Sequence, residues 1–239
     1  MAVVEWTRDG TVAVLTMNTS ENRHNPTYTS DMLACLDEIE ADREAKSIVL
    51  ASSDRKNWSL GIDLTWMMDA VNRNAMGDIR DFMYGLNTLF KRILTIPMPV
   101  IAAINGHAFG DGAIIACTCD FRFMRADRGF LCFPEVDINI PFLPGMLAMM
   151  KKALPYHKLE ELVYTGKRAT GRELEACHAV VKACEGEDEL MREAVAFART
   201  FTKGRAIFKE HKWRLHRHII EIMDKEDPAY IDPVNLMVS

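Results

Sequence analysis

One mostly apolar segment in the middle of the chain constrains the fold more than any other. Pro97 and Pro99 end a preceding helical pattern, because proline cannot continue a helix. The run Val100–Ile104 that follows indicates a buried strand, and after a glycine-rich turn the run Ala113–Cys119 indicates a buried helix. Phe121–Met124 then indicates the next strand. Two buried strands joined through a buried helix predict an α/β layered fold.

The N-terminal part of the chain predicts the same class. Val3–Trp6 and Val12–Thr16 indicate two strands around a tight turn. A helix that Thr29 or Ser30 can cap follows, and Ser47–Ala51 indicates a further buried strand. A longer helix is predicted by apolar residues at helical spacing: Ile79, Phe82, Met83, Leu86, Phe90 and Ile93.

Length and charge bound the function. The 239 residues suffice for one large domain, or for a domain with a helical appendage. The net charge of −5 gives no global basic field that would attract nucleic acid. No apolar run approaches the ~18 residues of a membrane span, and the first residues do not resemble a signal peptide. The last residues are not a peroxisomal signal, so we expect a cytoplasmic protein.

The six cysteines do not have the spacing of a metal site. We interpret them as small buried side chains in a reducing compartment and predict no metal centre.

Two glycine-containing turns each precede a predicted helix. Ser59–Leu64 follows a loop, and Asn105–Gly112 follows a strand. A helix N-terminus offers free N–H groups and the positive end of the helix dipole, and glycine lets the backbone approach a ligand. Two such ends facing each other form an oxyanion hole. Each turn by itself also fits a structural role. His107 lies within the second turn, but a histidine without a nucleophile as partner gives no catalytic triad.

Glu135 is a carboxylate in apolar surroundings, within the stretch from Phe130 to Met150. A carboxylate in such a place either pairs with a cation or has a raised pKa. A raised pKa suits an acid/base that exchanges a proton near neutral pH. The residues themselves leave both interpretations open, a salt-bridged structural glutamate and a catalyst.

Three segments in this order and spacing resemble the crotonase (enoyl-CoA hydratase/isomerase) superfamily over nearly the whole chain: Asn57–Leu64, Ile96–Asp120 and Asp127–Ile138. Within the superfamily, the chain is most similar to plant-type Δ3,Δ2-enoyl-CoA isomerases in the segments Asp63–Trp66, Pro97–Ala108 and Arg125–Gly129. The resemblance implies an α/β fold of the crotonase (ClpP/crotonase) type, built from repeated ββα units with a C-terminal helical region. Residues 1–190 would carry the acyl-CoA site, and residues 191–239 would form a helical trimerisation region.

The resemblance also implies roles for the backbone of both turns. In the family, the first oxyanion donor is the N–H after the glycine of the first turn, which is Ile62 here. The second donor is the middle residue of the triplet Gly110-Asp111-Gly112. Asp111 departs from the usual glycine or alanine, and a carboxylate aimed at an oxyanion would oppose catalysis. We therefore expect its side chain to turn away and cap the helix that starts at Gly112. The alternative is that Asp111 carries a proton in the reaction.

Glu135 matches the second of the two glutamates that hydratases of the family use, whereas the position of the first falls on Ile114. Hydration needs both groups, but double-bond migration needs only one. The resemblance therefore implies an isomerase that converts a 3-enoyl-CoA to a 2-enoyl-CoA through a dienolate, with Glu135 as the single acid/base. The alternatives are another crotonase-type enzyme on a CoA thioester, such as a hydrolase, decarboxylase, dehalogenase or hydratase, and a non-catalytic CoA-binding subunit.

Coenzyme A would be part of the substrate, and the resemblance implies no separate cofactor. The carbonyl of Leu60 is expected to meet the adenine, while Arg23 either meets the CoA phosphates or is solvated. Six basic residues near the C-terminus either contact the phosphates or form a solvated helix face: Lys203, Arg205, Lys209, Lys212, Arg214 and Arg217. The family forms trimers, so we expect a homotrimer or a dimer of trimers, with no nucleic-acid or membrane partner.

Overall fold

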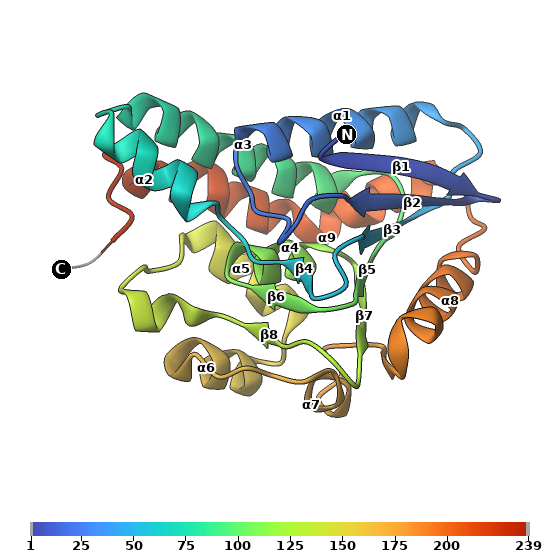
Figure 1. The fold of residues 1–239 in the computed structure, drawn as a ribbon. Coiled ribbons are helices and arrows are strands. Elements are labelled where there is room, and N and C mark those ends of the chain that lie inside the picture. Colours follow the sequence, from blue (N-terminus) through green and yellow to red (C-terminus); the bar gives the residue numbers. More distant parts are fainter. Residues whose placement is uncertain (1, 238–239) are drawn as a thin grey trace.

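A computed structural model describes residues 2–237, and a six-stranded sheet lies at its centre (Figure 1). The order across this sheet is β1 (Val4–Asp9), β2 (Val12–Met17), β3 (Ser47–Ser52), β5 (Val100–Ile104), β7 (Phe121–Arg125) and β9 (Lys182–Cys184). The hairpin β1–β2 is antiparallel, and the later pairings are parallel. The strands β3 and β5 are buried along their whole length, as expected of parallel strands covered on both faces.

A smaller parallel sheet consists of β4 (Asn57–Ser59), β6 (His107–Phe109) and β8 (Leu131–Cys132). Each of its strands follows a strand of the large sheet and leads into a helical segment. These segments are α2 (Leu64–Asn72), α4 (Asp111–Thr118) and the short 3₁₀ helix η1 (Pro134–Ile138). This repetition is the ββα unit that the resemblance implied. Since parallel strands end at the same edge, the three segments all begin near one another.

Helices cover the two faces of the large sheet. The helices α1 (Pro26–Ala41), α3 (Met76–Thr95) and α9 (Arg205–Lys225) contribute to the main core on one face, where α3 contacts both of the others. The helix α8 (Gly186–Ala198) packs on the other face. Alternate residues of β2, β3, β5 and β7 enter the two cores, because successive side chains of a strand point to opposite faces. The remaining helices are α5 (Pro144–Ala153), α6 (Tyr156–Thr165), α7 (Gly171–Ala176) and α10 (Pro228–Ile231).

The strands and the buried helix predicted from the sequence are confirmed, with ends within three residues of those expected. The predicted cap of α1 is wrong. Asn25 is the N-cap, and its side chain accepts a hydrogen bond from the N–H of Tyr28 at 3.1 Å. Pro26 takes the first helical position, where its fixed φ favours the helix and no N–H is needed. Thr29 therefore lies inside the first turn and is buried.

The C-terminal region shares the core of the rest of the chain. The helix α9 packs against α3 and α5, and Ile219 and Met223 belong to the main core. The boundary expected after residue 190 divides α8, whose apolar face covers the large sheet without interruption from Leu190 to Ala198. The trimerisation role of residues 191–239 stays a prediction.

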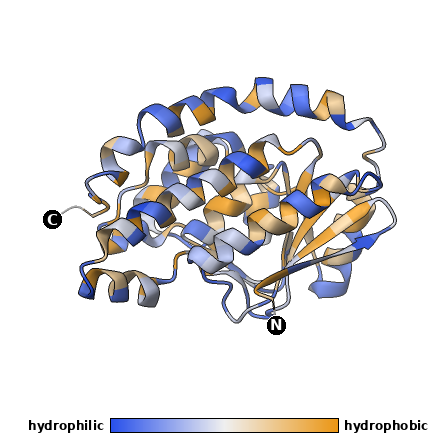
Figure 2. Ribbon diagram, turned by 90° about the horizontal axis from the view of Figure 1, so that it is seen from above, coloured by the Kyte–Doolittle hydropathy of each residue, from blue (hydrophilic) through white to orange (hydrophobic). Residues whose placement is uncertain are grey.

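Hydrophobic residues gather on the strands and the central helices, as Figure 2 shows. Within residues 2–237, no helix is both long enough and apolar enough to cross a bilayer.

Candidate active site

The two glycine-containing turns meet at the end of the small sheet. The strands β4 and β6 pair in parallel, so the segments that follow them lie side by side. A Cβ added to Gly61 would lie 2.8 Å from the backbone N of Asp111, and one added to Gly112 would lie 2.3 Å from the carbonyl oxygen of Ser59. Gly61 also has a φ of +73°, which disfavours other residues. Glycine at these positions permits the close approach of the two turns.

Each turn presents a free backbone N–H. The N–H groups of His24 and Asp63 bond to the carbonyl oxygens of Gly61 and His24, both at 2.8 Å, which leaves Ile62 between them. Asp111 is the first residue of α4 and has no partner within the helix. Across residues 2–237, neither the N–H of Ile62 nor that of Asp111 donates a hydrogen bond. Two donors, one at the positive end of a helix dipole, are therefore available to an oxygen atom.

Glu135 reaches the same place from the third ββα unit. Its helix η1 follows β8, which pairs with β6. A Cβ added to Gly110 would lie 3.0 Å from Oε1 of Glu135, so glycine at this position makes room for the carboxylate. The left-handed residue Asn139 ends η1, and its N–H donates to the carbonyl oxygen of Glu135. The carboxylate is thus held beside the second turn by local backbone structure.

The surroundings of Glu135 raise the pKa of its carboxyl group into the range where it can exchange a proton near neutral pH. Burial raises the pKa of Glu135 to about 7, with a smaller contribution from the nearby charge of Asp111, while the hydrogen bond of its own N–H acts in the opposite direction. Its Oε2 is buried and accepts no hydrogen bond, and none of the ion pairs among the described residues includes Glu135. The salt-bridged alternative left open by the sequence is therefore wrong, because the apolar surroundings contain no cation for this carboxylate.

The side chain of Asp111 does not cap a helix, contrary to expectation. The helix α4 begins at Asp111 itself, its N-cap is Gly110, and no side chain caps it. The carboxylate instead reaches the loop before α1, where its Oδ2 lies 2.6 Å from Nδ1 of His24. Both side chains are buried. Sequence reasoning missed His24, because the two residues are 87 positions apart and no local pattern links them.

The two residues expected to meet coenzyme A contact each other. Nη1 of Arg23 donates to the carbonyl oxygens of Leu60 at 3.2 Å and Ile62 at 3.4 Å. Its Nε donates to Glu21 at 3.1 Å. Arg23 is therefore anchored at the rim of the first turn, with about a third of its side chain exposed, and it can still present its positive charge to a ligand.

Comparison with known proteins agrees with this geometry. The family model described as Enoyl-CoA hydratase/isomerase matches residues 7–231. The chain belongs to the crotonase (enoyl-CoA hydratase/isomerase) family. The resemblance stated from the sequence is confirmed, and the protein is an acyl-CoA enzyme of this family.

Similar proteins carry two kinds of name. The chain is 31% identical over 176 residues to an Arabidopsis thaliana protein named Enoyl-CoA delta isomerase 3, with 73% of each protein covered. It is 30% identical over 197 residues to a Putative enoyl-CoA hydratase of Thermus thermophilus, with 81% of this chain and 76% of the relative covered. A crystal structure of an enoyl-CoA hydratase/isomerase family protein from Pseudomonas syringae superposes with a TM-score of 0.86 at 22% identity, covering 96% and 97% of the two chains. The crotonase fold expected from the sequence is therefore confirmed.

Ile114, which the resemblance matches to the first glutamate of the hydratases, offers no titratable group. It lies in the first turn of α4, where its N–H donates to the carbonyl oxygen of Gly110 at 3.1 Å, and its side chain is buried. Within α2, Trp66 packs edge-on against Phe82 with ring centroids 4.9 Å apart, whereas Met68 is exposed.

The six basic residues near the C-terminus do not form one surface. Arg205 donates to backbone carbonyls around the end of α1, including that of Glu40 at 2.7 Å. Nζ of Lys212 is buried on the carbonyl oxygens of Ile93 and Met98 and on the carboxylate of Asp120. For Lys212, both alternatives from the sequence are wrong, since its charge is buried within the fold. Arg205 is half-buried, and its guanidinium binds these backbone carbonyls rather than forming part of a solvated helix face. The other four are exposed: Lys203, Lys209, Arg214 and Arg217.

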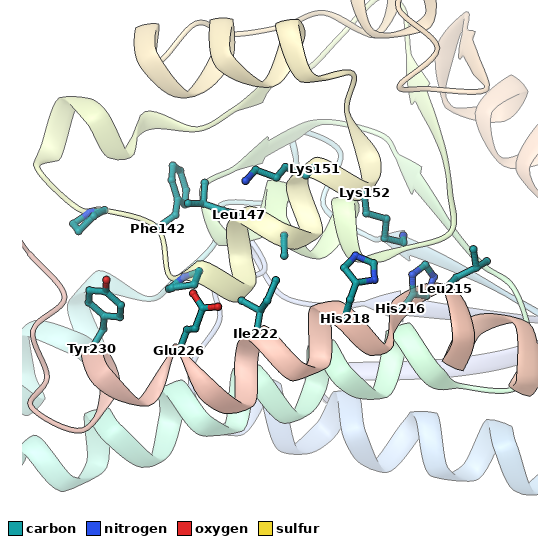
Figure 3. A pocket seen from close by; sticks show the side chains of 13 residues that line it. Phe142, Leu147, Lys151, Lys152, Leu215, His216, His218, Ile222, Glu226 and Tyr230 are labelled. Carbon is teal, nitrogen blue, oxygen red and sulfur yellow. The ribbon is translucent and has the colours of Figure 1, made fainter.

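A cavity of about 670 Å³ lies between α5 and α9 (Figure 3). Its lining is partly apolar, through Leu147 and Ile222, and partly basic, through Lys151 and His218. Neither of the two glycine-containing turns nor Glu135 lines it. Phe142, which does, packs edge-on against Phe133, the residue just before η1.

Proposed function

We propose that this crotonase is a Δ3,Δ2-enoyl-CoA isomerase that uses Glu135 as its single acid/base. The observation that carries the proposal is the unpaired, buried carboxylate of Glu135 with a pKa of about 7. By resemblance, Ile114 stands where hydratases of the family have their first glutamate. Hydration needs a second acid/base to activate water, and Ile114 cannot serve. Double-bond migration needs only one group, which first accepts and then returns a proton.

The mechanism follows from the geometry. The N–H groups of Ile62 and Asp111 bind the thioester carbonyl oxygen and stabilise the negative charge that develops on it. The carboxylate of Glu135 removes a proton from the α-carbon, which gives a dienolate. Protonated Glu135 then delivers that proton to the γ-carbon, and the double bond moves into conjugation with the thioester. The proton count balances without water or a cofactor.

For the binding of coenzyme A, the proposal uses the two residues that the resemblance assigned to it. The carbonyl oxygen of Leu60 meets the adenine, and Arg23, which donates to that carbonyl, contributes charge for the phosphates. We further propose that the protein assembles as a homotrimer or a dimer of trimers through residues 191–239. Large apolar side chains exposed on α9 support this role: Ile207, Trp213 and Leu215. Size-exclusion chromatography with light scattering tests it, and only monomer would contradict it. The cytoplasmic location stays a prediction.

Glu135→Gln tests the reaction. Conversion of a 3-enoyl-CoA to the conjugated thioester, followed by ultraviolet absorbance, should lose about 10²- to 10⁴-fold in kcat, the usual contribution of a general acid/base. Asp137→Asn is the matched control, because Asp137 lies exposed on the same short helix. Wild-type turnover in Glu135→Gln would rule out the mechanism.

A hydratase that uses Asp111 as its second group is the competing function, because Oδ1 of Asp111 is buried without a hydrogen-bond partner. Hydration of a 2-enoyl-CoA at a rate above that of isomerisation would favour it. Absence of turnover for every acyl-CoA in a broad panel would favour the CoA-binding subunit.

A further inference from the structure

Three buried polar side chains form a continuous series of contacts beside the two glycine-containing turns. Oδ2 of Asp111 lies 2.6 Å from Nδ1 of His24, and Nε2 of the same ring lies 2.9 Å from Oγ of Ser59. His24 and Ser59 are fully buried and Asp111 is 4% exposed. The imidazole also stacks on the ring of Tyr28, with centroids 4.2 Å apart. The reaction proposed above uses none of these side chains.

Hydrogen-bond accounting assigns the protons of these three side chains. The single hydroxyl hydrogen of Ser59 goes to the carbonyl oxygen of Asn22 at 2.8 Å, and the N–H of Gly61 donates to the same hydroxyl oxygen at 3.2 Å. Oγ of Ser59 must therefore accept from Nε2–H of His24. One further proton then lies between Nδ1 of His24 and Oδ2 of Asp111, since two lone pairs at 2.6 Å would repel. The His24–Asp111 pair is neutral in sum.

This arrangement is not a nucleophilic triad, although it contains serine, histidine and aspartate. Oγ of Ser59 belongs to a fully buried residue, and its hydrogen points at a backbone carbonyl rather than at the imidazole. No thioester can reach it, and the histidine cannot accept its proton.

The imidazole connects both turns. The backbone of His24 pairs with Gly61 and Asp63 on either side of Ile62, while its ring holds the carboxylate of Asp111, whose N–H is the second donor. Through Ser59 the ring also bonds indirectly to the N–H of Gly61. A displacement of His24 would therefore move both donors.

We propose that His24 is a positioning residue that neutralises Asp111 and fixes the two oxyanion turns. It allows a carboxylate to occupy a position beside developing negative charge, where an unpaired one would oppose the reaction. The direction in which Asp111 acts on the pKa of Glu135 agrees, since the two carboxylates are close enough to interact. This inference rests on the proposed oxyanion role of Ile62 and Asp111.

Removing one partner of a buried pair leaves the other charge unpaired, whereas removing both partners leaves no unpaired charge. The test compares these two kinds of variant. His24→Phe keeps the aromatic stack but leaves Asp111 alone, and we expect kcat to fall about 10²-fold, the effect of a lost oxyanion donor. The pH at which kcat/KM is half-maximal should move upward. Removing the charge as well, in His24→Phe/Asp111→Ala, should recover most of that loss, because replacing both partners of a buried pair costs much less than removing one.

Two further variants keep the test decisive. Asp111→Asn is isosteric and can donate to Nδ1 of a neutral His24, so we expect it to fold and keep kcat within about ten-fold of wild type. His107→Phe is the control, because it makes the same substitution at the other histidine near the second turn. A double variant as inactive as His24→Phe, or wild-type kcat and pH profile in His24→Phe, would overturn the proposal. Loss of all turnover in Asp111→Asn would instead assign Asp111 a proton-carrying role.

A binding measurement tests the positioning role of His24 independently of the reaction that the enzyme catalyses. Titration calorimetry with a saturated acyl-CoA does not depend on which reaction the enzyme catalyses. We expect His24→Phe to weaken binding about five-fold or more and the double variant to restore it. If the wild type fails to isomerise any 3-enoyl-CoA while this binding pattern holds, the proposed function is wrong and the positioning role stands. Unchanged binding in His24→Phe contradicts the positioning role itself.

Discussion

Carboxylates lie close to both ends of α4, but the groups that surround them differ. At the C-terminal end, Asp120 accepts from Nζ of Lys212 at 2.6 Å and from the N–H of Val100 at 2.8 Å. Burial by itself would raise the pKa of Asp120, but Lys212, His216 and Lys152 together hold it well below its usual value. At the N-terminal end, no cation among residues 2–237 pairs with Glu135, and one oxygen each of Glu135 and Asp111 lacks a partner there.

The difference in pairing distinguishes a charge that has a structural role from a carboxylate that can take part in a reaction. Lys152 donates to the last carbonyls of α4, including that of Cys119 at 2.7 Å, and so satisfies the helix end. Burial lowers its pKa to about 8 against the opposing effect of Asp120. The paired carboxylate of Asp120 keeps its charge near neutral pH. The unpaired carboxylate of Glu135 can exchange a proton there.

Removing the charged partner of Asp120 at the C-terminal end of α4 should produce the largest effect. We expect that variant to lose stability without a change in catalysis. Lys212→Met removes the main partner of buried Asp120, so we expect a loss of about 3–5 kcal/mol in the free energy of unfolding. Denaturant titration measures it. Lys209→Met, exposed on the same helix, is the control and should change little. If Lys212→Met left the free energy of unfolding unchanged, the two ends of α4 would not differ as described.

At the unpaired end, substitution should stabilise the fold in a pH-dependent way. The pKa of Glu135 rises from an ordinary 4.5 to about 7 on folding, so the folded state binds the extra proton. The stability associated with protonated Glu135 is complete below pH 4.5 and is lost as the pH rises through 7. Glu135→Gln should therefore be more stable than wild type at pH 8, by up to about 3 kcal/mol, with no such gain at pH 4.5. An equal difference at both pH values would contradict a raised pKa.

The same pKa predicts the pH dependence of catalysis. Because the ionised carboxylate removes the α-proton, kcat/KM should rise with pH and level off above about 7. Between pH 7 and pH 5 it should fall by about 50-fold, because the ionised fraction of Glu135 falls from about one half to about one hundredth. Asp137→Asn should show the same profile. A flat profile would mean that Glu135 is not the base.

The smallest expected effect is at the rim of the site. Arg23→Met removes a partly exposed charge, so we expect KM for acyl-CoA to rise about five- to ten-fold with kcat little changed. Arg214→Met, on an exposed arginine of α9, is the control. A loss confined to kcat would instead indicate that Arg23 holds the first turn through its bonds to Leu60 and Ile62.

The sequence predicted most of the large sheet and missed the small one. Runs such as Val100–Ile104 are apolar along their length and partly β-branched, and burial on both faces favours that pattern. The strands β4, β6 and β8 have only two or three residues each, too few to show a period. Their pairing nevertheless brings the three turns together, and only the order of the motifs indicated it beforehand.

By itself, the sequence determined which local structures could form and which residue types were available for chemistry. Glycines at 61, 110 and 112, an apolar stretch around Glu135 and isoleucine at 114 are local facts, and they restrict the chemistry at any site built from them. Tertiary structure alone decided which charges are paired. Arg205 and Lys212 turned inward, Asp111 found His24, and Glu135 found no cation. Hydrogen-bond partners far apart in sequence meet only after folding, and the cost of burying a charge depends on that meeting.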